Sequence, residues 1–244
     1  TFSAPVLCVD APGVSQAHVT ISPEGASITW SILEPKLGST IDEGLGQIHA
    51  GPNAGTITIR ATAGDTECYV DAPFSIGKVE SVTLAPAEIC ADGSSTAQAT
   101  AVTTPLGRQV LWSIPGNARG CAVDATGKVT AGATGGPITV RAEVAGAPGC
   151  GEETELMLVK VESVTLVPVL ICGDGTAQAT ATTVPEGRLV TWSISGDPLG
   201  CTIDQAGLVI AGGTGGPIMV RAEKHPRLAI VEVLIASPEF ERVV

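Results

Sequence analysis

Aromatic side chains are scarce in this sequence: Phe, Trp and Tyr make up 3% of its 244 residues. Basic residues are also few, since 13 Lys and Arg stand against 25 Asp and Glu, for a formal net charge of -12. This charge repels a phosphate backbone or an anionic membrane surface, so nucleic acid is not an expected partner. The longest apolar stretch, from Leu228 to Ala236, is interrupted by Glu232 and is far too short to span a bilayer. We therefore expect no membrane span in this chain.

Catalytic and metal-binding motifs are missing as well. The seven cysteines contain no CxxC pair, which argues against a zinc site and a thioredoxin-like redox centre. HExxH, GxSxG and phosphate-loop motifs are also absent. We therefore expect no enzyme, no cofactor and no metal. The cysteines indicate disulfides in an oxidising compartment, which places the chain outside the cell or on its surface.

The sequence is dominated by an internal repeat. The segment that begins VESVTLAPAEIC at Val79 recurs as VESVTLVPVLIC at Val161, and both copies run on to TVRAE or MVRAE. A more divergent copy precedes them, with ITWSI around Trp30 and TITIRAT near residue 60. Trp30, Trp112 and Trp192 occupy one position of this repeat, so each unit has the size of a small domain. The expected domains are residues 1–78, 79–160 and 161–244, and the opening strand of the first is incomplete.

Short strands and tight turns fill each unit. The chain has 30 glycines and 17 prolines, and Val, Thr, Ile and Ala dominate the remainder. In the middle copy the alternating segments VESVTL, STAQATAV, QVLWSI, KVTAG, PITVRAEV and TELMLVKV predict strands. Asp124 to Gly127 and Asp204 to Gly207 fit type I turns with Asp first and Gly fourth. The pattern predicts an all-β fold of three tandem β-sandwiches.

The ordered motifs SVTL, AT, VTWS, VD..G.VTAG and ITVRA resemble the bacterial immunoglobulin-like domain, group 2. This family forms tandem repeats in surface adhesins of the invasin and intimin kind. The resemblance covers essentially the whole chain and implies three immunoglobulin-like domains. It implies no catalytic residues, because members serve as stalks, binding modules and filament parts. The first copy departs most, since it has Ser39 in place of a cysteine and one extra residue in its IDEGLG turn.

Conspicuous residues have structural interpretations. The tryptophan of each repeat lies inside a predicted central strand, so we expect it in the core rather than on a carbohydrate-binding surface. The three histidines occupy unrelated repeat positions, which argues against a shared site. Asp10, Asp92 and Asp174 each follow a cysteine by two residues, and no DxDxDG arrangement surrounds them. We expect turn residues there rather than calcium ligands.

The cysteines fall into three columns of the repeat. The first column is Cys8, Cys90 and Cys172; the second is Cys121 and Cys201; the third is Cys68 and Cys150. Pairing within a repeat gives Cys8–Cys68 in the first and Cys172–Cys201 in the third. In the middle repeat Cys90–Cys121 is favoured by similarity, and Cys150 is left free or for an intermolecular bond. Each bridge would contribute about 3 to 4 kcal/mol.

The ends of the chain complete one repeat when joined. FERVV followed by TFSAPVLC aligns without a gap on KVESVTLVPVLIC. Either the tail of one molecule adds a strand to the first domain of the next, or the sequence is a window of a longer covalent array. The residues expected in this subunit contact are Thr1, Phe2, Phe240, Glu241, Arg242, Val243 and Val244.

The expected function is that of a structural subunit of an extracellular filament or cell-surface stalk. The last strand of each domain should run into the first strand of the next without a flexible linker. Expected partners are further copies of the chain, joined head to tail, or flanking repeats of the same chain. The alternative is an adhesin, or a ligand- or carbohydrate-binding module of a larger secreted protein.

Overall fold

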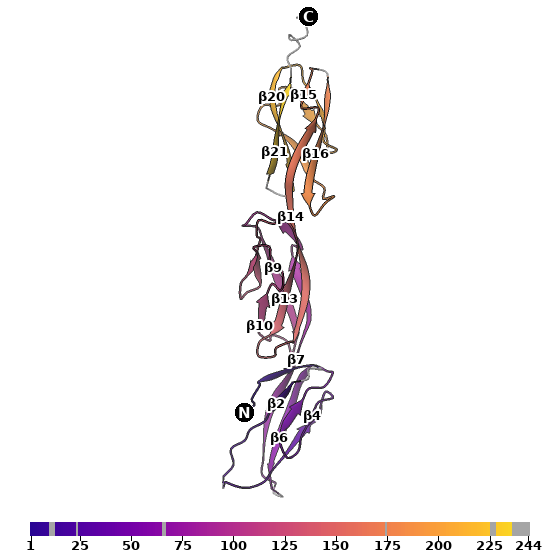
Figure 1. Cartoon of the computed structure of the whole chain (residues 1–244). Coiled ribbons are helices and arrows are strands. Elements are labelled where there is room, and N and C mark those ends of the chain that lie inside the picture. Colours follow the sequence, from indigo (N-terminus) through magenta and orange to yellow (C-terminus); the bar gives the residue numbers. More distant parts are fainter. Residues whose placement is uncertain (10–12, 23, 65–66, 174, 225–227, 236–244) are drawn as a thin grey trace, which may run out of the picture.

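The computed structural model describes residues 1–9, 13–22, 24–64, 67–173, 175–224 and the backbone of 228–235. The described chain is built of strands and turns, and three β-sandwich domains follow one another as an extended rod (Figure 1). The predicted all-β fold of three tandem β-sandwiches is confirmed. No described helix has the length and apolarity needed to cross a membrane.

Strand boundaries repeat from domain to domain. The first domain contains β1 (Val6–Cys8), β2 (Val14–Gln16), β3 (Ile28–Leu33), β4 (Thr40–Ile41), β5 (Gln47–His49), β6 (Gly55–Ala63) and the start of β7 (Tyr69–Ala85). The second contains the end of β7, β8 (Glu88–Cys90), β9 (Thr96–Thr104), β10 (Val110–Ser113), β11 (Ala122–Val123), β12 (Lys128–Thr130), β13 (Gly136–Val144) and the start of β14 (Gly151–Val167). The third contains the end of β14, β15 (Leu170–Ile171), β16 (Thr176–Val184), β17 (Thr191–Ser195), β18 (Thr202–Ile203), β19 (Leu208–Ile210), β20 (Gly216–Glu223) and β21 (Leu228–Ile235).

Two long strands join the domains. The first half of β7 pairs with β6 in the first domain, and its second half pairs with β9 in the second. In the same way β14 pairs first with β13 and then with β16. Each has 17 residues and serves as the last strand of one sandwich and the first strand of the next. The expected passage between domains without a flexible linker is confirmed.

A tryptophan packs in each sandwich, as predicted. Trp30 and Trp192 are each 8% exposed, and Trp112 is half-buried. Each indole lies over the glycine that ends the nearby Asp turn, where an added Cβ would come within about 3 Å of the ring. The glycines concerned are Gly46, Gly127 and Gly207. Trp30 and Trp192 are therefore core residues, as predicted.

The predicted type I turns are confirmed. The N–H of Gly127 donates to the carbonyl of Asp124 at 3.0 Å, and the N–H of Gly207 donates to that of Asp204 at 3.1 Å. The first domain has one residue more in its turn, so Gly46 donates to Asp42 instead. The chain therefore absorbs the insertion in the loop and leaves the tryptophan contact intact.

The second cysteine column has a local role that pairing within repeats did not foresee. The N–H of Gly132 donates to Sγ of Cys121, and the N–H of Gly212 donates to Sγ of Cys201, both at 3.2 Å. In the first domain Oγ of Ser39 accepts the N–H of Gly51 at 3.0 Å. This position therefore needs an acceptor for a buried N–H, and either a hydroxyl or a thiol supplies it.

The expected Cys172–Cys201 and Cys90–Cys121 disulfides are therefore wrong. Cys121 and Cys201 are held within their own loops as hydrogen-bond acceptors, and neither is in a disulfide. The serine in the first repeat was the available signal, because a residue that forms a cross-link in two repeats is not replaced by an isosteric hydroxyl without loss.

The loop glycine makes a sharp test of this packing. A Cβ on Gly212 would lie 2.3 Å from the carbonyl oxygen of Leu199, whereas one on Gly213 meets nothing within 4 Å. Gly212→Ala should destabilise the third domain by about 1–3 kcal/mol through overpacking. Gly213→Ala should be neutral or stabilising by about 0.4–1 kcal/mol. Denaturant unfolding of both variants measures this, and equal midpoints would contradict the close approach.

Candidate functional site: the domain junctions

The first junction is crossed by a disulfide. Cys8 ends β1 in the first domain, and Cys150 immediately precedes β14 in the second. Their Cα atoms lie 5.1 Å apart although 142 residues separate them in sequence. Among the described residues, which include all seven cysteines, this is the disulfide that the structure contains. It joins two domains rather than two strands of one domain.

The expected Cys8–Cys68 pairing is wrong, and so is the expectation that Cys150 is free or intermolecular. Cys8 lies opposite Gly77, near the second domain, because β1 runs parallel to β7. Cys68 immediately precedes β7 and lies nine residues before Gly77. At about 3.3 Å per residue the two cysteines are separated by roughly 30 Å. Participation of Cys8 in a disulfide, by contrast, is confirmed.

An apolar cluster surrounds this disulfide. Val6 from the first domain is 1% exposed and packs with Val79, Val144 and Ala147 of the second-domain side. Close approach is possible because Gly77 has no side chain; a Cβ there would lie 3.1 Å from Val6. The first junction is thus fixed by a continuous strand, a shared core and a covalent bond.

The second junction uses charges at the equivalent positions. Glu88 occupies the repeat position of Val6, and Lys224 that of Val144. The Glu88 carboxylate lies 2.9 Å from Arg188 Nη1 and 3.4 Å from Lys224 Nζ. Sγ of Cys90, the counterpart of Cys8, lies 2.9 Å from the carbonyl oxygen of Lys224. These side chains are about one-third exposed, so each ion pair contributes roughly 0–1 kcal/mol.

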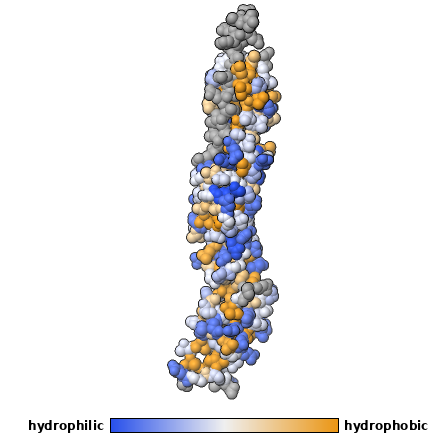
Figure 2. Space-filling model, viewed as in Figure 1, coloured by the Kyte–Doolittle hydropathy of each residue, from blue (hydrophilic) through white to orange (hydrophobic). Residues whose placement is uncertain are grey.

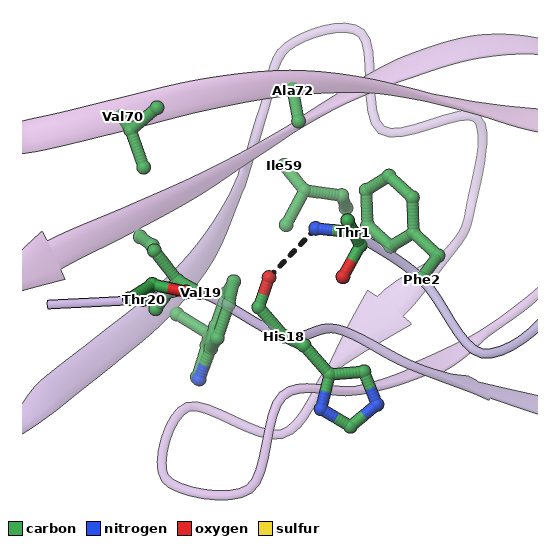
Figure 3. Close-up of a pocket in the computed structure, with 10 residues that line it drawn as sticks. Thr1, Phe2, His18, Val19, Thr20, Ile59, Val70 and Ala72 are labelled. Atoms are coloured by element: carbon green, nitrogen blue, oxygen red, sulfur yellow. Dashed lines mark hydrogen bonds between the residues drawn. The ribbon is translucent and has the colours of Figure 1, made fainter.

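A groove opens in the first domain beside the start of the chain. Its cavity volume is about 240 Å³, and its walls include His18, Val19, Trp30 and Ala61. The ammonium of Thr1 donates to the carbonyl of His18 at 2.7 Å, as Figure 3 shows, and the N–H of His18 donates back to Thr1. Phe2 forms the next bridge, with Ala17. The groove begins where this short ladder ends.

The other two domains fill the equivalent space with valines of their first strand. In the second domain Val79 and Val82 pack beside Trp112 and Ala142. In the third, Val161 and Val164 pack beside Trp192 and Ala222. The groove of the first domain presents Trp30 and Ala61 at the same repeat positions. The groove therefore lies where the other two domains place the valines of their first strand.

The opposite end of the rod exposes apolar residues of the third domain. Leu170 is 55% exposed, although it occupies the position of the buried Val6. Val167 and Val169 beside it are 71% and 65% exposed. Cys172 follows β15 and is exposed. Figure 2 shows hydrophobic residues near both ends of the rod. The far end thus carries the same kinds of residue that the first domain contributes to the first junction.

Two of the seven residues predicted for the subunit contact lie within the described part of the chain. Thr1 and Phe2 line the groove, whereas Phe240, Glu241, Arg242, Val243 and Val244 lie outside the described residues.

Asp92 is a turn residue: partial burial raises the pKa of its carboxyl, but hydrogen bonds from Ser94 and Ser95 outweigh this and hold the pKa well below its usual value. Asp10 and Asp174 lie outside the described residues.

No family model and no curated protein matches the chain. Solved structures do match. Invasin, described as a bacterial integrin-binding protein, has 14% identity over 97% of this chain and 58% of its own, with a TM-score of 0.39. The Escherichia coli adhesin FdeC has 17% identity over 97% and 96%, with a TM-score of 0.40. A C-terminal fragment of intimin, in complex with its receptor's binding domain, has 14% identity over 64% of each chain and a TM-score of 0.43.

The disulfide should stabilise the first two domains selectively. Cys8→Ser opens a 142-residue cross-link and should lower their unfolding free energy by about 2–5 kcal/mol. Cys201→Ser is the matched control, because it keeps an acceptor for Gly212 and should change stability by less than about 1 kcal/mol. Thermal unfolding without reductant measures both. A Cys8→Ser variant as stable as the parent would contradict a formed bridge.

Salt should act on the second junction and leave the first unchanged. At about 1 M salt the screening length is ~3 Å, so the partly exposed pairs of Glu88 weaken. Glu88→Gln should reproduce the effect at low salt, while each domain keeps its stability within about 0.5 kcal/mol. Residual dipolar couplings, analysed domain by domain, report the relative alignment. Loss of order between the first and second domains instead would contradict this assignment.

Proposed function

We propose that the chain is a structural rod of an extracellular filament or surface stalk, in which copies join head to tail. The observation that carries the proposal is the complementarity of the two ends. The third domain offers the exposed Leu170 and Cys172, and the first domain offers an open groove and Cys68. The first junction inside the chain is likewise formed by an apolar side chain, Val6, and by two cysteines, Cys8 and Cys150.

The groove accepts a strand from the next copy. Edge strands pair readily with added strands, because their backbone N–H and C=O groups are available. The proposed occupant is the tail Phe240–Val244 of a second copy, which aligns with Lys160–Val164 of the third domain, so that Val244 takes the position of Val164 and Glu241 that of Val161. It would extend the ladder that Thr1 and Phe2 begin with His18 and Ala17.

The tail alone binds weakly. Burial of Phe240, Val243 and Val244 contributes at most about 1.5 to 3 kcal/mol each. Association costs roughly 4 to 15 kcal/mol. A durable assembly therefore also needs contacts between the flanking domains, of the kind that bury Val6 and Val144 at the first junction.

The Cys8–Cys150 disulfide supports an extracellular location for the rod. A disulfide that joins two domains persists in an oxidising environment, which supports a place outside the cell. Two 17-residue strands that cross the junctions support a rod that transmits tension along its length. Burial of Trp30 and Trp192 removes the aromatic platform that a carbohydrate-binding module would use.

Two variants test the head-to-tail contact. Deletion of Glu239–Val244 should abolish end-to-end association if the tail is the connector. Val70→Trp should reduce it at least tenfold, because Val70 lines the groove and is 52% exposed, so that the larger side chain blocks the groove without overpacking the core. Ala125→Leu, in an exposed turn, is the control.

Electron microscopy and sedimentation measure the outcome. Parent and Ala125→Leu protein should form ordered fibres, and the other two variants should remain single rods. Truncated protein that forms fibres of unchanged spacing would eliminate the tail as connector. A native polypeptide much longer than 244 residues would favour a covalent array over assembly of separate subunits.

A further inference from the structure

The cysteines of the first and third columns occupy opposite ends of each domain. The far end of a domain is the end toward which its last strand runs, and the near end is the end at which that strand begins. A first-column cysteine lies at the end of the short strand that pairs in parallel with the domain's last strand. Cys8 is the last residue of β1, and Cys172 directly follows β15. A third-column cysteine immediately precedes the domain's last strand, as Cys150 precedes β14. The Cys8–Cys150 disulfide therefore joins the far end of one domain to the near end of the next.

Cys68 has the same backbone setting as Cys150. The carbonyl of Cys150 accepts the N–H of Val144 at 2.8 Å, and the carbonyl of Cys68 accepts the N–H of Ala63 at 2.9 Å. Both bonds close the hairpin before a 17-residue strand. Cys68 is exposed at the near end of the first domain.

Cys172 has the setting of Cys8 at the far end of the third domain. Leu170, two residues earlier, corresponds to Val6, which is buried beside the disulfide at the first junction. Both Leu170 and Cys172 are exposed in the single chain. A domain placed against this end as the second is placed against the first would bring its third-column cysteine to Cys172.

We propose that Cys172 of one copy forms a disulfide with Cys68 of the next copy. The proposal rests on the head-to-tail assembly proposed above and names its covalent link. The two thiols lose two protons and two electrons as the S–S bond forms. A disulfide oxidant accepts them by thiol–disulfide exchange and is released as two thiols.

The bond cannot form within one chain. Cys68 precedes β7 in the first domain and Cys172 follows β15 in the third, and Figure 1 shows these two domains at opposite ends of the rod. The 17 residues of β7 cross the first two domains, and the seven from Val161 to Val167 cross the third. At about 3.3 Å per residue these segments span roughly 80 Å. The second junction does not compete, because the sequence EKHPRL from Glu223 to Leu228 contains no third-column cysteine.

Peptide mapping without reduction tests the bond directly. Assembled protein, alkylated and digested with trypsin, should yield peptide Ala61–Lys78 linked to peptide Val161–Arg188. Peptide Thr1–Lys36 linked to Ala142–Lys160, which carries Cys8–Cys150, is the internal positive control. Denaturing gels without reductant should show a ladder with steps of 24.5 kDa.

Matched variants separate this bond from the assembly itself. Cys172→Ser should abolish the ladder, and Cys201→Ser should retain it. Ordered fibres in which Cys68 and Cys172 are both alkylated would overturn the disulfide and leave the filament. Cross-linked oligomers that never form ordered fibres would support the disulfide and overturn the filament. A Val161–Arg188 peptide linked to a sequence absent from this chain would overturn the proposed partner.

Discussion

The shape of the molecule depends on strands that belong to two domains at once. β7 donates and accepts hydrogen bonds with β6 over its first half and with β9 over its second. Apart from a β-bulge at Glu80, both halves of β7 are paired, so the axis of one sandwich continues into the next. The segment SIGKVESVTL is rich in β-branched residues and contains no proline, which allows one strand to run through the junction.

A continuous strand fixes direction but still allows twist and bend about its axis, and the two junctions limit these motions differently. The first adds a dry cluster around Val6 and the Cys8–Cys150 bond. The second adds the ion pairs of Glu88 with Arg188 and Lys224, which are partly exposed and screened by salt. Val6, Cys8 and Val144 at the first junction occupy the repeat positions of Glu88, Cys90 and Lys224 at the second. The same positions therefore produce a covalently locked junction and a more adjustable one.

The repeat predicted the strands, the core tryptophans and the Asp turns, because these depend on contacts within one copy. It did not predict the disulfide. Counting columns assigned Cys8 to Cys68 on the assumption that a repeat bonds within itself, whereas parallel pairing of β1 with β7 places these residues about 30 Å apart. The far end of one domain and the near end of the next are neighbours in space, and only the strand direction reveals this. Ser39 carried the other missed signal, that the second column accepts a hydrogen bond.

The contacts proposed between copies differ from the first junction in one physical respect, which is that no peptide bond crosses them. Inside the chain, β7 keeps the two domains at a high effective concentration, so modest contacts suffice. Between copies a short tail in the groove must first offset the cost of association, and its few apolar side chains come close to that cost without a large margin. A disulfide formed after docking would replace the missing peptide connection. Exposed cysteines at the two outer positions of the same columns that bond at the first junction are what such a mechanism requires.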